Sequence, residues 1–323
     1  MLQLIFGKSG CGKTYAVTEE IGELLLRGVP VILLCPEQEA VIAERRTTER
    51  FSGRVPTQSL EILNFGRLPE RVFREYGGLT DALLSEGGRR LVMHRTLAET
   101  APFLREYGRC IEDAAMIERL LAVIAECKMF CVSPSMLEKA GSTLPAGYRR
   151  LSDKLADLSL IYAAYEGLLH REYHDPEDML TALDTVLWES DGAFFKDKHI
   201  YLDGFNGFTS QQYAIIAHML DHAASVTVTL GCAEDSGEEP EWMMRRILET
   251  RRNLERMAAD RNMVPNIRTF TENKRCQSPA LRHLQDHLWV MGSTETADVG
   301  DDIALFACDN PFDEAEAVAL DIS

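Results

Sequence analysis

The residues with the clearest chemical meaning lie close to the start of the chain, in Gly7-Lys8-Ser9-Gly10-Cys11-Gly12-Lys13-Thr14. This is the pattern of a phosphate-binding loop, in which glycines let backbone N–H groups converge on phosphate oxygens. Lys13 is expected to reach the β- and γ-phosphates of a nucleotide, and Thr14 to bind Mg²⁺. We therefore predict that residues 7–14 bind ATP with Mg²⁺, the alternative being a glycine turn with a purely structural role.

A second acidic position follows the apolar run Ile200-Tyr201-Leu202. Hydrolysis of a bound triphosphate usually needs a carboxylate at the end of a neighbouring strand to hold Mg²⁺. Asp203 is the best candidate for this catalytic and metal-binding role, and the alternative is a turn aspartate before a glycine. In many such ATPases a glutamate follows directly and positions water. Here the next residue is Gly204, which argues against efficient hydrolysis.

The elements that must position these residues alternate along the chain. Strands are predicted at 2–6, 29–34, 59–63, 199–202, 225–230 and 303–307, and helices at 13–27, 39–51, 210–222 and 238–263, with a further helix ending at Tyr76. Strands that alternate with helices at this spacing are typical of an α/β fold with a parallel sheet.

The middle of the chain has a different rhythm, because from about residue 80 to residue 190 apolar residues recur with helical spacing. We therefore predict an all-helical subdomain, 80–190, inserted between two parts of a P-loop ATPase core, 1–79 and 191–275. Residues 276–323 are expected to be a linker and the start of a following domain, since the helix predicted from Asp313 has no C-terminal cap.

Composition limits the class of protein. The chain has 323 residues, 46% of them hydrophobic, and a net charge of −17, so long-range attraction to DNA is not a property of its overall charge. This composition does not exclude a local basic strip. The chain has no apolar run of membrane-spanning length and no signal peptide, so we expect a cytoplasmic protein without membrane contact. The eight cysteines are scattered and predicted to be free, buried thiols.

Several phrases in a fixed order resemble the N-terminal part of the AddB/RexB family of bacterial helicase–nuclease subunits. They are the phosphate loop, Cys35-Pro36-Glu37-Gln38, Leu63-Asn64-Phe65-Gly66-Arg67-Leu68, Leu202-Asp203-Gly204-Phe205-Asn206-Gly207-Phe208-Thr209 and Asn310-Pro311-Phe312-Asp313-Glu314-Ala315-Glu316. The resemblance runs along nearly the whole chain. It implies a superfamily 1 helicase-like core, an AddA/RexA-type partner in a heterodimer, and a role in resecting DNA double-strand breaks. It also implies that the nuclease and its iron–sulfur cluster lie beyond residue 323, so that this chain has little activity alone.

The resemblance further implies that the core scans single-stranded DNA for a recombination hotspot called Chi and is not a motor. Gln38, Phe65, Arg67 and Phe208 match the family's DNA-binding positions. Ala40 stands where better-known members have a threonine, and Glu70 where they have an aromatic residue, which leaves open the DNA sequence that this chain reads.

The candidate DNA contacts also make physical sense by themselves. Phe65 and Phe208 follow predicted strand ends, where aromatic rings can stack on bases, and Arg67 can contact a phosphate or a base edge. The alternatives are two core phenylalanines and a surface salt bridge.

Two other functions remain open. The first is an active ATP-driven translocase that uses an acid other than residue 204. The second is a P-loop kinase for a small molecule, which fits the long helical insertion poorly.

Overall fold

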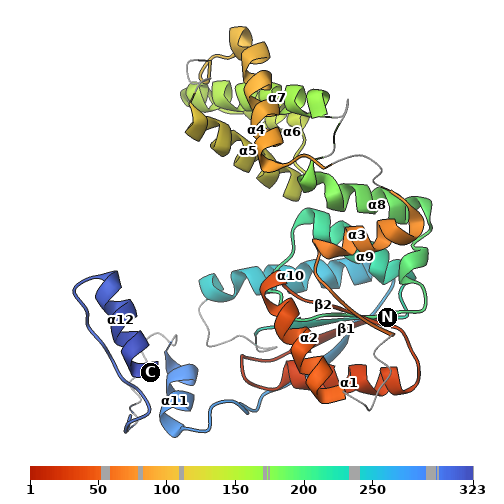
Figure 1. Cartoon of the computed structure of the whole chain (residues 1–323), viewed down its shortest axis with the longest axis vertical. Coiled ribbons are helices and arrows are strands. Elements are labelled where there is room, and N and C mark those ends of the chain that lie inside the picture. The colour runs from red at the N-terminus through yellow and green to blue at the C-terminus, as the bar shows by residue number, and fades with distance from the viewer. Residues whose placement is uncertain are drawn as a thin grey trace.

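The computed structural model describes residues 1–51, 59–78, 83–108, 113–169, 173, 175–232, 241–288, 296 and 298–322. Figure 1 shows a sheet with helices packed against it, a separate group of helices above, and a tail that carries α11 (Pro279–His287) and α12 (Pro311–Ile322) to one side.

The sheet contains β1 (Leu2–Phe6), β2 (Val31–Leu34), β3 (Leu60–Leu63), β4 (His199–Leu202), β5 (Ser225–Leu230) and β6 (Asn266–Thr269). Their order is β3-β2-β4-β5-β1-β6, and every neighbouring pair is parallel. The central strands are apolar and buried because helices cover both faces of a parallel sheet. The prediction of an α/β fold with a parallel sheet is therefore confirmed, and β4 joins the same sheet as β1.

Alternate residues of each strand face opposite layers of helices. On one face, α1 (Lys13–Leu26) and α2 (Glu37–Phe51) pack on Ile5, Leu33 and Tyr201. On the other face, α3 (Arg67–Tyr76), α8 (Met179–Glu189), α9 (Ser210–His222) and α10 (Glu241–Ala259) cover the remaining strand residues. The two layers hold the loops at the strand ends in place.

The helices α4 (Glu86–Thr100), α5 (Ala114–Met129), α6 (Pro134–Ser142) and α7 (Arg149–Leu169) pack around an apolar core of their own. Ser85, Asp113 and Ser133 cap the N-termini of α4, α5 and α6. Short 3₁₀ helices lie at Ala101–Phe103, Ala146–Tyr148, Pro176–Asp178 and Ala193–Phe195. Among the described residues no single helix is long and apolar enough to cross a membrane; α5 and α6 pass that test only as a pair, bent by 98°.

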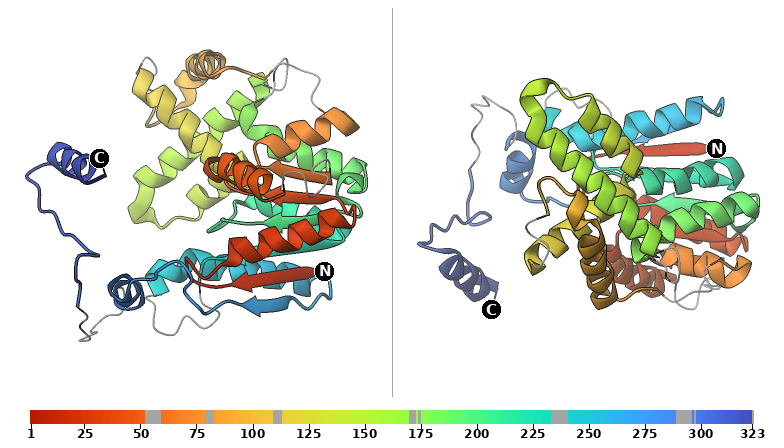
Figure 2. Two further views of the ribbon diagram at one scale, coloured as in Figure 1. Left: turned by 60° about the horizontal axis from the view of Figure 1, so that its bottom comes forward. Right: turned by 90° about the horizontal axis from the view of Figure 1, so that it is seen from above.

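Two sequence-based expectations need correction, and one strand was not predicted. Residues 303–307 form no strand, and Leu305 is 97% exposed, so their apolar character did not lead to strand pairing. The strand that does occur, β6, is a polar and exposed edge strand, for which the sequence contains little periodic signal. The seven described cysteines are all free thiols, but Cys131 and Cys308 are exposed and Cys127 and Cys276 half-buried, so burial is confirmed only for Cys11, Cys35 and Cys232; Cys110 lies outside the described residues. Figure 2 shows α12 standing away from the sheet, with Phe312 and Ile322 exposed.

A buried cluster of charges lies where the helical group meets the sheet core. Lys128 of α5, whose side chain is 3% exposed, makes ion pairs with Glu166 at 2.7 Å, Asp175 at 2.9 Å and Asp178 at 2.8 Å. Burial disfavours its ammonium group, but Asp175 and Asp178 outweigh this and raise the pKa of Lys128. Asp175 also caps the turn at Pro176–Asp178, as its position before a proline indicates. Lys128 therefore joins Glu166 of α7 to the two aspartates that precede α8.

We expect Lys128→Ala to lower the free energy of unfolding by about 3–5 kcal/mol, because it removes the cation that contacts all three carboxylates and leaves Arg89, 3.4 Å from Asp175, to neutralise the cluster only in part. Lys139→Ala, which removes an exposed lysine from α6, should change it by less than about 0.5 kcal/mol. Urea unfolding followed by helical circular dichroism measures both. Equal stability of the two variants would contradict the role given to Lys128.

Candidate functional site

The carboxyl ends of the parallel strands meet at one edge of the sheet, where ligands of α/β folds bind. β1 leads into the phosphate loop and β4 into Asp203, and β5 lies between them. Neighbouring strands are about 4.8 Å apart, so the two strand ends are separated by ~10 Å. This distance leaves room for a metal-bound phosphate group between Lys13 and Asp203.

The phosphate loop has the backbone that its glycines predict. Gly10 and Gly12 adopt φ values of +85° and +95°, which other residues rarely tolerate. A Cβ on Gly7 would lie 2.4 Å from Cys11 Sγ and 2.7 Å from the Phe270 carbonyl oxygen, so this position also requires glycine. The loop is thus shaped by glycine at each of these positions.

Positive groups converge on this loop. Lys13 Nζ donates hydrogen bonds to the carbonyl oxygens of Gly7 and Lys8, the second at 3.0 Å. No described side chain caps the N-terminus of α1. Its first N–H groups are therefore available to an anion, which the helix dipole also favours. The arrangement can bind phosphate oxygens.

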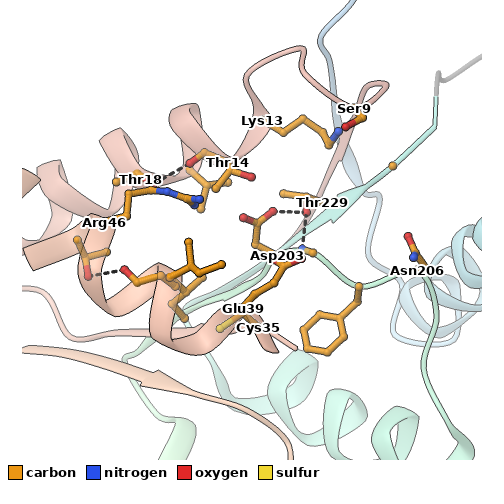
Figure 3. Close-up of a pocket in the computed structure, with 18 of the residues that line it drawn as sticks. Ser9, Lys13, Thr14, Thr18, Cys35, Glu39, Arg46, Asp203, Asn206 and Thr229 are labelled. Atoms are coloured by element: carbon orange, nitrogen blue, oxygen red, sulfur yellow. Dashed lines mark hydrogen bonds between the residues drawn. The ribbon is translucent and has the colours of Figure 1, made fainter. Parts of the chain in front are cut away.

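A cavity of about 440 Å³ opens beside the loop. Figure 3 shows Asp203 and Glu39 on the opposite side of this cavity from Lys13 and Thr14. The cavity is lined by residues from different elements, which include Ser9, Lys13, Thr14, Cys35, Glu39, Arg46, Asp203, Gly204, Phe205, Asn206, Thr229 and Arg275. The sheet therefore brings the two halves of the predicted nucleotide site together.

Asp203 is held in a fixed orientation at the end of β4. Its carboxylate is buried and accepts a hydrogen bond of 2.5 Å from Thr229 Oγ1 of β5. The backbone N–H of Gly204 donates to the same hydroxyl at 3.4 Å. A carboxylate here and the Thr14 hydroxyl across the cavity are hard oxygen donors, the kind of ligand that Mg²⁺ prefers.

A second carboxylate, Glu39 of α2, shares this end of the cavity. Partial burial and the charge of Asp203 raise the pKa of Glu39. Burial, followed by the charges of Glu39 and Asp203, raises the pKa of the Cys35 thiol to about 11. The carboxylates of Asp203 and Glu39 therefore make this end of the cavity negative, an effect that Arg46 of the same lining offsets in part, and they lie opposite the positive phosphate loop.

One segment at the phosphate loop was not predicted from the sequence. It crosses the loop and consists of Asn273-Lys274-Arg275. The Lys274 N–H donates to the Gly10 carbonyl oxygen at 2.9 Å, and Arg275 Nη1 donates to Ser9 Oγ at 3.3 Å. Asn273 Oδ1 accepts from the Arg275 N–H at 3.0 Å and fixes the turn. The segment follows β6. Because the sequence does not predict β6, it also does not predict that this segment reaches the phosphate loop.

A second hollow, of about 500 Å³, lies beside the first at the ends of β2, β3 and β4. Its lining includes Phe65, Arg67 and Phe205, and Phe205 also lines the nucleotide cavity. The Phe65 and Phe208 rings have centroids 6.1 Å apart, so these predicted DNA contacts lie together. Phe65 is only 5% exposed and packs in the core, whereas Phe208 is half-buried.

The other two predicted contacts are more accessible. Gln38 is exposed in the first turn of α2. The Arg67 side chain is 62% exposed, with its guanidinium 3.8 Å from Glu44 Oε1. This separation makes a weak ion pair that a phosphate can replace.

Known proteins resemble this chain along most of its length. A family model described as ADDB, N-terminal, matches residues 4–285. The chain belongs to the AddB family. A protein of Pelotomaculum thermopropionicum, named as one of the subunits of an ATP-dependent helicase/deoxyribonuclease, is 34% identical over 336 residues, covering 100% of this chain and 28% of that protein.

Proteins with the same name give similar matches within the family. The one from Caldanaerobacter subterraneus is 30% identical over 334 residues, covering 100% of this chain and 28% of its own length. The one from Thermoanaerobacter sp. is 36% identical over 240 residues, covering 73% of this chain and 20% of its own length. The chain therefore spans less than a third of these relatives.

We expect Arg275→Ala to weaken Mg·ATP binding about tenfold, because one charge-assisted hydrogen bond to a phosphate contributes about 1.5 kcal/mol or more. The loss should be smaller for Mg·ADP if the guanidinium faces the γ-phosphate. Titration calorimetry of both nucleotides measures this, with Arg252→Ala, an exposed arginine on α10, as the control for charge. An unchanged affinity in Arg275→Ala would contradict the assignment.

Proposed function

We propose that this chain is the ATP-binding, helicase-like part of a subunit that helps to resect DNA double-strand breaks. In this proposal it scans single-stranded DNA for a Chi-type hotspot, has weak or no motor activity, and works with an AddA/RexA-type partner. The observation that carries the proposal is a phosphate loop and a buried aspartate that face one cavity, with a second hollow beside it. The names of its relatives, which combine helicase and deoxyribonuclease, support the wider role.

The nucleotide part of the proposal rests on charge and backbone. Lys13, Arg275 and the N-terminus of α1 provide positive potential on one side of the cavity. Thr14 and Asp203 would hold Mg²⁺ on the side of the phosphates that faces β4. Mg²⁺ supplies charge neutralisation of the phosphates when bound.

Slow turnover follows from residue 204. A motor hydrolyses ATP at every step and needs a group that positions water. Gly204 has no side chain for this, so a water-positioning group would have to come from another element, and a less well-placed substitute slows turnover because one well-placed catalytic group is worth about 10²–10⁴ in rate. ATP would then act mainly as a bound ligand that favours one conformation.

The DNA part of the proposal rests on the second hollow. Because Phe205 lines both cavities, a strand of DNA in the hollow and a nucleotide in the first cavity would touch the same loop. Arg67, which lines the hollow, would contact a phosphate. Phe208 and Gln38 lie outside its lining and would contact bases at its margin, with Phe65 packed against Phe208. The helices α4–α7, with their own core, correspond in this proposal to a subdomain inserted into the ATPase core.

One observation favours the second candidate, an active translocase. Arg275 places a guanidinium at the phosphate loop within this chain, a group of the kind that stabilises charge on a transferring phosphoryl group. A working motor remains the alternative that the turnover experiment tests.

We expect Lys13→Ala to remove most Mg·ATP binding by the chain, because it deletes the charge that meets the phosphates. In the assembly with a partner whose own motor is inactivated, DNA-stimulated turnover should be slow, well below the many ATP per second of a motor, although ATP still binds. Turnover of many ATP per second that disappears with Lys13→Ala would show a working motor instead. Unchanged nucleotide affinity in Lys13→Ala would contradict the site itself.

We expect Arg67→Ala to weaken binding of single-stranded DNA about tenfold and to reduce the slope of log K against log salt by about 0.7, as loss of one phosphate contact does. Arg74→Ala, which removes an exposed arginine from the last turn of the same helix, is the matched control. Fluorescence anisotropy at several salt concentrations measures both. An equal effect of the two variants would argue against the hollow as the DNA site.

A further inference from the structure

The carboxylate of Glu39 lies where a side chain on residue 204 would begin. A Cβ built on Gly204 would be 2.5 Å from Glu39 Oε2, 3.1 Å from its Cδ and 3.3 Å from its Oε1. The space beside Asp203, which a glutamate at 204 would enter, is therefore filled by a carboxylate that comes from a different element, the first turn of α2.

The backbone at residue 204 explains why the carboxylate comes from elsewhere. Gly204 has a φ of +85°, a left-handed conformation that is costly for a residue with a side chain. A glutamate at this position would be strained and would also collide with Glu39. The backbone after Asp203 therefore requires glycine at residue 204. The Glu39 carboxylate fits beside it only because this glycine has no side chain.

Glu39 is also placed to act in the cavity. It lines the same space as Lys13, Thr14 and Asp203 and is exposed to it. Two later glutamates of α2 have partners: Glu44 lies 3.8 Å from Arg67 and Glu49 2.7 Å from Arg45. Within the described residues, no ion pair to Glu39 is formed. Its oxygens therefore remain available to water in the cavity.

We propose that Glu39 is a catalytic residue that orients the water attacking the γ-phosphate of bound ATP, in place of the glutamate missing at residue 204. This inference rests on the proposed nucleotide site. Glu39 accepts a hydrogen bond from the water and takes up the proton that the water loses. The water oxygen bonds to the γ-phosphorus, the bond from that phosphorus to the β,γ-bridging oxygen breaks, and ADP leaves with the electron pair. The proton then passes to solvent, so that ATP and water give ADP, phosphate and a proton.

The position of Glu39 also connects hydrolysis with the second hollow. Glu37, two residues before Glu39, lines that hollow, and Gln38, the residue between them, is exposed. A shift of the first turn of α2 on DNA binding would move Glu39 relative to Gly204. The slow turnover of this site is therefore expected to depend on DNA through α2.

The test measures single-turnover hydrolysis of Mg·ATP by the full chain, with and without single-stranded DNA, together with direct Mg·ATP binding. Glu39→Gln keeps the size of the side chain and Glu39→Ala removes it. Glu49→Gln, on the exposed side of the same helix, controls for loss of a charge from α2. Lys13→Ala gives the background without a bound nucleotide.

We expect Glu39→Gln and Glu39→Ala to reduce the hydrolysis rate about 10²-fold, with Mg·ATP affinity within about threefold of the unmodified chain and Glu49→Gln unchanged. Hydrolysis that is unaltered in Glu39→Gln, or that never exceeds the Lys13→Ala background, would overturn the role of Glu39 while ATP binding stands. Loss of the nucleotide site itself would show separately, as Mg·ATP affinity that Lys13→Ala does not change.

Discussion

The insertion of β4 between β2 and β5 is the constraint on which the site depends. These pairings place Asp203 one strand away from Thr229 and two strands away from the phosphate loop. The same pairings place the end of β2, and with it the first turn of α2, beside Gly204. Lys13 and Asp203, nearly two hundred positions apart in the sequence, thus face a single cavity. The paired strands that hold them there determine the geometry of the site.

The nucleotide and DNA proposals are linked by the short loop that follows β4. Asp203 and Gly204 face the phosphate loop, while Phe205 lines both cavities and packs on Phe65 with ring centroids 5.6 Å apart. Such a loop has little freedom, since Thr229 holds its first residues and the aromatic cluster holds the next. Binding of a ligand in one cavity can therefore affect the other cavity through this loop. The ion pairs of Lys128 with Asp175 and Asp178 add a second connection, which holds the helical group against the helix α8 that packs on the same sheet.

The sequence predicts those parts of the molecule whose signal is local. The glycine spacing of residues 7–12 indicates the loop because the backbone angles themselves require glycine, and the apolar strands indicate the parallel sheet. β6 could not be found in this way, because an exposed polar edge strand has neither a run nor an alternation of apolar residues. Residues 303–307 show the opposite. They are an apolar run of the kind that predicts a strand, but they pair with no strand of the sheet. Arg275 was missed together with β6, and the position of Glu39 over Gly204 depends on strand pairing, which no local pattern encodes. Phe65 looked like a base-stacking residue from its place after a strand, but only the packing of Phe205 and Phe208 reveals how much of its ring is buried.

In the proposed function, the phosphate loop, the Asp203 loop and the segment after β6 form one site for Mg·ATP. Hydrogen–deuterium exchange of the full chain with and without Mg·ATP tests it most directly, because backbone amides that bind phosphate or are held by a bound ligand exchange more slowly. We expect protection at residues 7–16, 203–206 and 273–276, with smaller changes in the first turn of α2. Exchange that Mg·ATP leaves unchanged in all three segments, or protection confined to other parts of the chain, would contradict it.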